Sequence, residues 1–126
     1  HPRNLFWPIM GALYGAGPDQ PYEVRLQVLQ DHQVALWDVL QSCVRETSLD
    51  ADILHEIPND FAAFLAAHPR MTHVFFNGAK AAQSFKRYVR DYPPSLMLTT
   101  LPSTSPAHAA RNFAQKREAW SVIRQV

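Results

Sequence analysis

An apolar run that ends at an Asn-Gly pair constrains the fold of this chain more than any other stretch. Val74, Phe75 and Phe76 precede Asn77-Gly78, and the glycine releases the backbone into a helix predicted over residues 79 to about 91. A second apolar run, predicted to be a strand, follows at residues 96–100. Strands that alternate with helices predict an α/β layered domain with a largely parallel sheet.

The other predicted elements are mostly helical. Pro8 suits the first turn of a helix whose buried face is Ile9, Met10, Leu13 and Tyr14. Further helices are predicted over residues 21 to about 32 (with Val24, Val28 and Leu29 on the inner side), over 61–67, and after Asn112, which has capping-box spacing to Gln115. The apolar residues 34–40 predict a strand covered on both faces, and residues 45–58 are predicted to be polar and irregular.

Length and charge indicate one domain with an uneven distribution of charge. A chain of 126 residues is long enough for a single core. The net charge of +1 conceals three Lys/Arg and nine Asp/Glu in residues 1–63, against nine Lys/Arg and two Asp/Glu in residues 64–126. This asymmetry predicts either one basic face offered to a polyanion or a mixture of both halves over one surface.

Several classes of protein are excluded or disfavoured. No run approaches the ~18 apolar residues needed to span a bilayer. Cys43 is the single cysteine, which rules out an internal disulfide and favours a reducing, intracellular compartment. The six histidines are scattered and none pairs with a nearby acid at ligand spacing, so we predict no metal.

Three polar features fall at or near the carboxyl ends of predicted strands, where parallel sheets bind ligands: Asp38, which interrupts the run at 34–40, Asn77-Gly78 and the loop at residues 101–109. Asp38 is either a general base or a structural carboxylate bonded to backbone N–H groups. Near the start of the chain, Pro2 and Pro8 stiffen a stretch that carries the Asn4 amide and the Phe6 ring. That stretch either grips a planar ligand or places an Asn at a helix cap with aromatics in the core.

Four segments carry a resemblance to the uracil-DNA glycosylase superfamily. They are HPRNLFWPIM, ALWDVLQSC, VFFNGAKA and LPSTSPAHA, in the order of the hypoxanthine-DNA (deoxyinosine) glycosylase branch, and the match runs from His1 to Trp120. Mismatch-specific uracil glycosylases share a similar N-x-FWP segment. The resemblance implies a three-layer α/β/α sandwich around a parallel sheet and cofactor-free hydrolysis of the N-glycosidic bond of a flipped base. The superfamily's opening motif ends a first strand that would precede His1, so residues 1–126 are expected to form one glycosylase-like domain lacking that strand.

The resemblance also implies roles for individual residues. It assigns the catalytic amide to Asn4 and the ring that stacks on the flipped base to Phe6. It assigns contacts with DNA to the second-motif loop, at Ser103, Thr104, Ser105, Pro106 and His108. Leu101 stands where many relatives have His or Asn.

Residue chemistry adds further candidates beside that loop. Asn77 either contacts the base edge or merely ends a strand, and five cations either contact phosphates or are solvated: Lys80, Lys86, Arg87, Arg90 and Arg111.

The sequence therefore predicts a monomeric, monofunctional DNA glycosylase in the cytoplasm, associated with the nucleoid. Its expected partner is DNA containing a deaminated base, either hypoxanthine or uracil. Alternatives are a mismatch-specific uracil/thymine glycosylase, a non-catalytic lesion sensor that binds DNA, and a small domain that binds other proteins.

Overall fold

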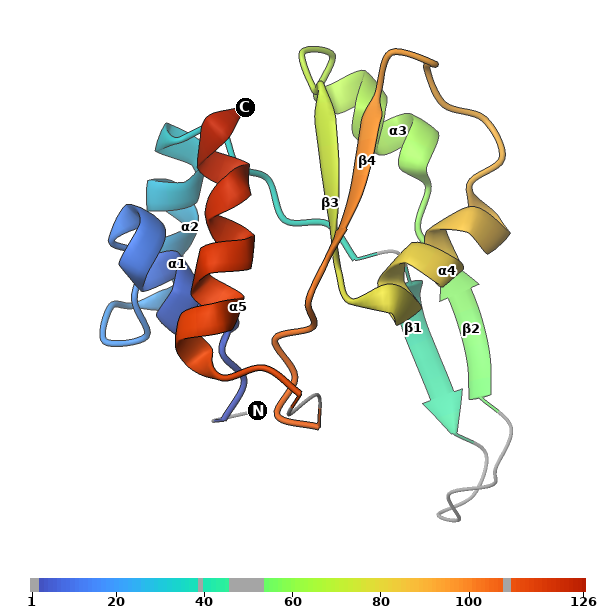
Figure 1. The fold of residues 1–126 in the computed structure, drawn as a ribbon. Coiled ribbons are helices and arrows are strands. Elements are labelled where there is room, and N and C mark those ends of the chain that lie inside the picture. Colours follow the sequence, from blue (N-terminus) through green and yellow to red (C-terminus); the bar gives the residue numbers. More distant parts are fainter. Residues whose placement is uncertain (1–2, 39, 46–53, 108–109) are drawn as a thin grey trace.

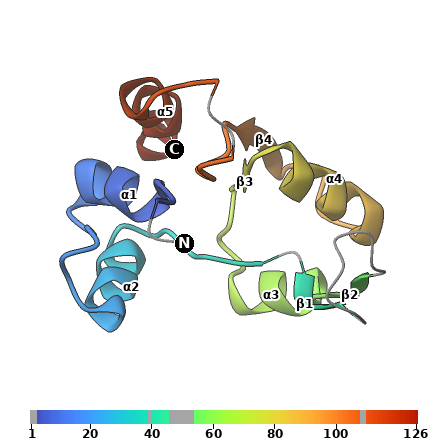
Figure 2. The same ribbon diagram turned by 90° about the horizontal axis from the view of Figure 1, so that it is seen from below.

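Three layers make up the computed structural model, which describes residues 3–38, 40–45, 54–107 and 110–126 (Figures 1 and 2). The central layer is a pair of strands, with one group of helices on each side of it. The strands are β3 (His73–Asn77) and β4 (Met97–Leu101). One group contains α1 (Phe6–Tyr14), α2 (Tyr22–Asp31), α5 (Phe113–Trp120) and a 3₁₀ helix (Ser121–Gln125), and the other contains α3 (Phe61–Ala67) and α4 (Ala79–Tyr88).

Strands β3 and β4 are parallel, and α4 connects them. The register pairs His73 with Met97 and Asn77 with Leu101, so both strands end at the same edge. Parallel neighbours require a crossover connection, which α4 provides. The predicted α/β class and parallel pairing are confirmed.

Strand alternation divides the apolar residues between two cores. Phe75 packs against one cluster while its neighbour Phe76 is buried in the other, because successive side chains of a strand point to opposite faces. The helical core is defined by Ile9, Met10, Leu13, Ala16, Leu29, Leu101 and Trp120. The α3–α4 core is defined by Phe61, Phe76, Phe85, Val89 and Leu96. The expected α/β/α layering follows from this division.

Local signals place the helix starts correctly. Gly78 has φ +92° directly before α4, a backbone conformation that glycine adopts readily. Asp60 caps α3 by accepting a hydrogen bond from Ala63 N at 3.1 Å. Asn112 and Gln115 form the predicted capping box at the start of α5.

The predicted strand at residues 34–40 is wrong. Residues 34–38 have no regular structure. A short antiparallel hairpin pairs β1 (Leu40–Arg45) with β2 (Leu54–Pro58), and β2 lies in the segment that was predicted to be irregular. Trp37 instead packs on Phe61 and Phe64, with ring centroids at 5.1 Å and 5.5 Å. The apolar run therefore anchors a connecting segment to the α3–α4 core.

Two smaller expectations also change. Val24 is 44% exposed, whereas Leu29 is buried as predicted. The neighbouring Arg25 lies over the Trp7 ring, with its guanidinium carbon 4.6 Å from the ring centroid. Helix α4 ends at Tyr88, short of the predicted residue 91.

The part of the chain that the structure describes has neither a metal-binding cluster nor a membrane-spanning helix. Within the described ranges, no three His, Cys, Asp or Glu side chains gather where they could hold a metal ion. None of the helices in those ranges combines the length and apolar character needed to cross a bilayer.

Candidate functional site

Three segments that are distant in sequence meet at Thr104. The Leu5 N–H donates to the Thr104 carbonyl oxygen at 3.0 Å. The Thr104 N–H donates to Asn77 Oδ1 at 2.9 Å, and Asn77 Nδ2 donates to Thr104 Oγ1 at 2.8 Å. The first stretch of the chain, the end of β3 and the loop after β4 therefore lie together.

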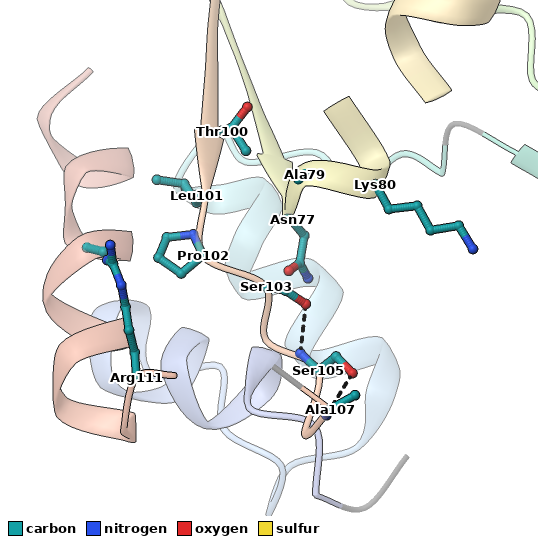
Figure 3. A pocket seen from close by; sticks show the side chains of 12 residues that line it. Asn77, Ala79, Lys80, Thr100, Leu101, Pro102, Ser103, Ser105, Ala107 and Arg111 are labelled. Atoms are coloured by element: carbon teal, nitrogen blue, oxygen red, sulfur yellow. Dashed lines mark hydrogen bonds between the residues drawn. The ribbon is translucent and has the colours of Figure 1, made fainter. Parts of the chain in front are cut away.

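A hollow of about 710 Å³ lies beside these contacts, at the edge where both parallel strands end. Its polar lining comes from the start of α4, the end of β4, the following loop and the segment before α5: Asn77, Lys80, Thr100, Ser103, Ser105 and Arg111 (Figure 3). This is the edge at which α/β sheets usually bind ligands.

The Asn4 side chain lies one residue before the N-cap of α1, which is Leu5, and keeps a donor available. Its Oδ1 accepts a hydrogen bond from Phe6 N at 2.9 Å, and the residue is half-buried. Because a backbone N–H only donates, the atom facing it must be the amide oxygen. Among the described residues, Asn4 Nδ2 has no hydrogen-bond acceptor. Asn4 is therefore not the N-cap that the sequence suggested but accepts the first N–H of the helix in a local turn. Within the described part of the chain, its amide nitrogen remains available to a ligand.

The Phe6 ring is held by two neighbouring aromatic rings. It meets Trp7 edge to face at a centroid distance of 4.9 Å and Trp120 at 5.8 Å. Phe6 is half-buried and packs against the helical core. The stacking of Phe6 on a base stays a prediction. The position of its ring is fixed by packing against the two neighbouring rings.

The loop after β4 is attached to α5. Trp120 Nε1 donates to the Pro102 carbonyl oxygen at 2.8 Å, and Lys116 Nζ donates to the Ser105 carbonyl oxygen at 3.4 Å. Lys116 is only 1% exposed. Its burial was missed in the sequence, although it lies four residues before the buried Trp120 and hence on the same helix face.

Two serine hydroxyls shape the loop and keep their protons available. Ser103 Oγ accepts from Ser105 N at 3.1 Å, and Ser105 Oγ accepts from Ala107 N at 3.2 Å (Figure 3). A hydroxyl that accepts a backbone N–H still has its own O–H to donate. Ser103 and Ser105 can therefore donate to an acceptor such as a phosphate oxygen.

One predicted ligand contact needs correction. Thr104 is 0% exposed and its hydroxyl oxygen accepts from Asn77, so the predicted contact between Thr104 and DNA is wrong. The Asn77 oxygen and one of its N–H groups are bonded to Thr104, and its predicted contact with a base edge stays a prediction. His108 lies outside the described residues.

The cations of the second half do not form one face. Lys80 and Arg111 line the hollow, whereas Lys86 and Arg87 lie in the last turn of α4 and Arg90 follows that helix. Arg124 lines a separate hollow of about 200 Å³ with Tyr14. Burial raises the pKa of Tyr14, and the charge of Arg124 acts in the opposite direction. The predicted basic surface is therefore reduced to the rim of the larger hollow and the exposed end of α4.

Asp38 does not belong to this site. It is exposed, and its backbone oxygen accepts from Asn59 Nδ2 at 2.6 Å. It does not line the larger hollow. The expectation that it interrupts a covered strand fails together with that strand.

Comparisons with known proteins agree with this arrangement. No protein-family model matches the chain. A Methanosarcina acetivorans protein named hypoxanthine DNA glycosylase is 33% identical over 130 residues, which cover 98% of this chain and 76% of that protein. The solution NMR structure of a candidate uracil DNA glycosylase from Methanosarcina acetivorans has a TM-score of 0.74 and 30% identity, covering 100% of this chain and 78% of that one. With its fold and most of its length shared in this way, the chain belongs to the hypoxanthine DNA glycosylase branch of the uracil-DNA glycosylase superfamily.

Proposed function

We propose that this chain excises hypoxanthine from DNA and that Asn4 supplies the amide that acts on the departing base. Membership of the family makes it a DNA glycosylase of base-excision repair, a hydrolase whose partner is DNA. The hydrogen bond from Leu5 N to the Thr104 oxygen carries the proposal, because it holds Asn4 beside the loop that flanks the hollow.

The chemistry requires a donor near the base. Breaking an N-glycosidic bond builds positive charge on the sugar and negative charge on the departing base. A donor that is fixed before the reaction stabilises that negative charge without reorganisation. Asn4 Nδ2 is such a donor, because the bond between Oδ1 and Phe6 N fixes the orientation of the amide. The second lone pair of Oδ1 is available to accept from an N–H of the base.

Deaminated bases suit this amide. Hypoxanthine has a carbonyl oxygen next to a ring N–H, and an amide carries a complementary donor and acceptor. Adenine has an amino group and an unprotonated ring nitrogen at those positions, so it does not match. Uracil has the same lactam arrangement, and it is the second candidate substrate because the similar solved structure is described as a uracil DNA glycosylase.

The loop and the rim of the hollow would hold the DNA. Ser103, Ser105, Lys80 and Arg111 are placed to contact phosphates. Pro106, together with His108, would enter the minor groove while the base is flipped and Phe6 stacks on it. We expect a monomer that acts on DNA containing a deaminated base, in the cytoplasm and associated with the nucleoid.

The test is an excision assay with the full-length natural protein. Duplexes containing inosine, uracil or a G:T mismatch are incubated with protein, and abasic sites are detected by alkaline cleavage. We expect the fastest release from inosine and no release of adenine from a matched control duplex. Preferential release from G:T would instead favour a mismatch-specific enzyme. A protein that binds inosine duplexes but releases no base would be a lesion sensor.

A further inference from the structure

We propose that Asn77 is a positioning residue that acts through Thr104 to fix the loop at residues 102–107 relative to Asn4. This inference rests on the proposed function of Asn4 and deepens it. It replaces a direct contact between Asn77 and the base with an indirect role in the geometry of the site.

Thr104 is attached in two directions by three hydrogen bonds. Its N–H and hydroxyl oxygen are bonded to the Asn77 amide at 2.9 Å and 2.8 Å, which ties it to the end of β3. Its carbonyl oxygen accepts from Leu5 N at 3.0 Å, which ties it to the residue after Asn4. Thr104 is fully buried, so water cannot replace any of these three hydrogen bonds unless the loop opens.

The end of β3 also touches the loop directly. A Cβ atom at Gly78 would lie 2.9 Å from Ser103 Cβ, closer than real side chains allow. Figure 3 shows the Asn77 amide directed toward the loop that carries Ser103, while Lys80 extends away from it. The short approach at Gly78 therefore brings Asn77 within reach of Thr104.

A contact between Asn77 and the base predicts a different response to the same substitution. In Asn77→Asp, one carboxylate oxygen still accepts from Thr104 N, and the Thr104 hydroxyl can rotate to donate to the other. The attachment is then kept, although the side chain can no longer donate to a base. A positioning role therefore tolerates Asp, whereas a contact that needs the amide donor does not.

The activity test uses single-turnover excision from an inosine duplex with enzyme in saturating excess. We expect Asn77→Asp to stay within about threefold of wild type and Asn77→Leu to lose roughly 10–10²-fold, because a displacement of about 1 Å in a site can cost 10²-fold. Tolerance of Asp should require the Thr104 hydroxyl, so adding Thr104→Val to Asn77→Asp should lower the rate at least about tenfold. The control is Thr72→Val, an exposed threonine bonded to His73 Nδ1 at 3.0 Å outside the hollow, which should leave the rate unchanged.

A second measurement reports the attachment without any chemistry. The Leu5 amide donates to Thr104, so its hydrogen exchange shows whether the loop is held against the first stretch. Asn77→Leu should speed this exchange at least about tenfold, and Asn77→Asp should not change it. This measurement remains valid if no base is excised, so failure of the proposed function and failure of the positioning role are distinguishable.

Two results would overturn the inference. One is Asn77→Asp losing excision while Leu5 exchange stays as in wild type, which would establish a direct contact with the base. The other is unchanged Leu5 exchange in Asn77→Leu. If Asn77→Leu does not fold, the comparison of Asn77→Asp with and without Thr104→Val decides by itself.

Discussion

The two sides of the loop at residues 102–107 hold it in different ways. On the helical side, Leu5, Lys116 and Trp120 all donate to main-chain carbonyl oxygens of the loop. On the sheet side, Asn77 bonds both the main chain and the hydroxyl of Thr104. Every residue type has a carbonyl, so the helical side fixes the path of the loop largely independently of its side chains. The sheet side depends on the identity of Thr104.

The two sides also contribute different parts of the site. The helical core supports Asn4 and Phe6, where aromatic packing and the hydrogen bond to Phe6 N fix the reacting amide. The sheet edge and the start of α4 supply half of the residues that line the hollow and one of its two cations, Lys80. The group proposed to act on the base and much of the surface proposed to hold DNA thus belong to separately packed regions. Substitutions on the two sides should separate excision from binding.

The largest effect is expected on the helical side, at Asn4. Asn4→Ala should lower single-turnover excision by roughly 10²–10³, as losing one fixed donor does in other enzymes. Affinity for an inosine duplex, measured by fluorescence anisotropy, should change little because the phosphate contacts lie elsewhere.

A matched variant separates catalysis from the local turn at the same position. Asn4→Asp keeps an oxygen for the Phe6 N–H but has no donor, so its melting temperature should match wild type while excision falls as in Asn4→Ala. If Asn4→Asp excises at the wild-type rate, the local turn is the only role of Asn4.

The next largest effect is expected at the rim of the hollow. Lys80→Gln with Arg111→Gln should weaken binding of all duplexes by roughly tenfold per lost contact at about 0.1 M salt, because each phosphate contact contributes about 0.9 to the slope of log K against log salt. The comparison is Lys86→Gln with Arg87→Gln, at the other end of α4. A larger loss for this second pair would move the DNA surface away from the hollow.

A smaller effect is expected from loosening the loop itself. Replacing Ser105-Pro106 by Gly-Gly adds backbone freedom of about 0.4–1 kcal/mol per residue, so excision from a duplex should fall about tenfold. Excision from single strands should change less, since no base must be pushed out of a stack. Ser105→Ala controls for the lost hydroxyl. Equal slowing on both substrates would rule out that the loop helps to push the base out of the stack.

The smallest effect is expected from Trp120→Phe. This substitution removes the donor to the Pro102 oxygen while keeping a ring in the helical core. The free energy of unfolding, measured in urea, should therefore fall by about 0.5–1.5 kcal/mol beyond the cost of the smaller ring. Trp37→Phe, in a ring cluster with Phe61 and Phe64, provides the baseline for ring size. Equal losses in the two variants would show that the indole hydrogen bond adds nothing.

Local chemistry explains what could be predicted from the sequence. The Gly78 turn and the Asn112–Gln115 capping box each depend on residues within a few positions, and each is found as expected. The meeting of the Asn77-Gly78 end with the loop after β4 follows from parallel strand order.

Features that depend on distant partners were not predictable. Residues 34–38 have strand-like composition, but Trp37 finds its neighbours on α3 and no ladder forms. Nothing near Asn77 or Thr104 in the sequence indicates that they bond each other. The burial of Lys116 likewise depends on the loop that covers it.

That covered lysine gives the protein an internal reporter of loop opening. The chain has three lysines, of which Lys80 and Lys86 are exposed and Lys116 is buried under Ser105. An amine-reactive reagent should modify the two exposed side chains at once and reach Lys116 only while the loop is lifted. The ratio of the labelled peptides in a mass spectrum then measures how often the loop opens, with Lys86, which does not line the hollow, as the internal standard. Bound DNA that presses the loop onto α5 would slow the labelling of Lys116.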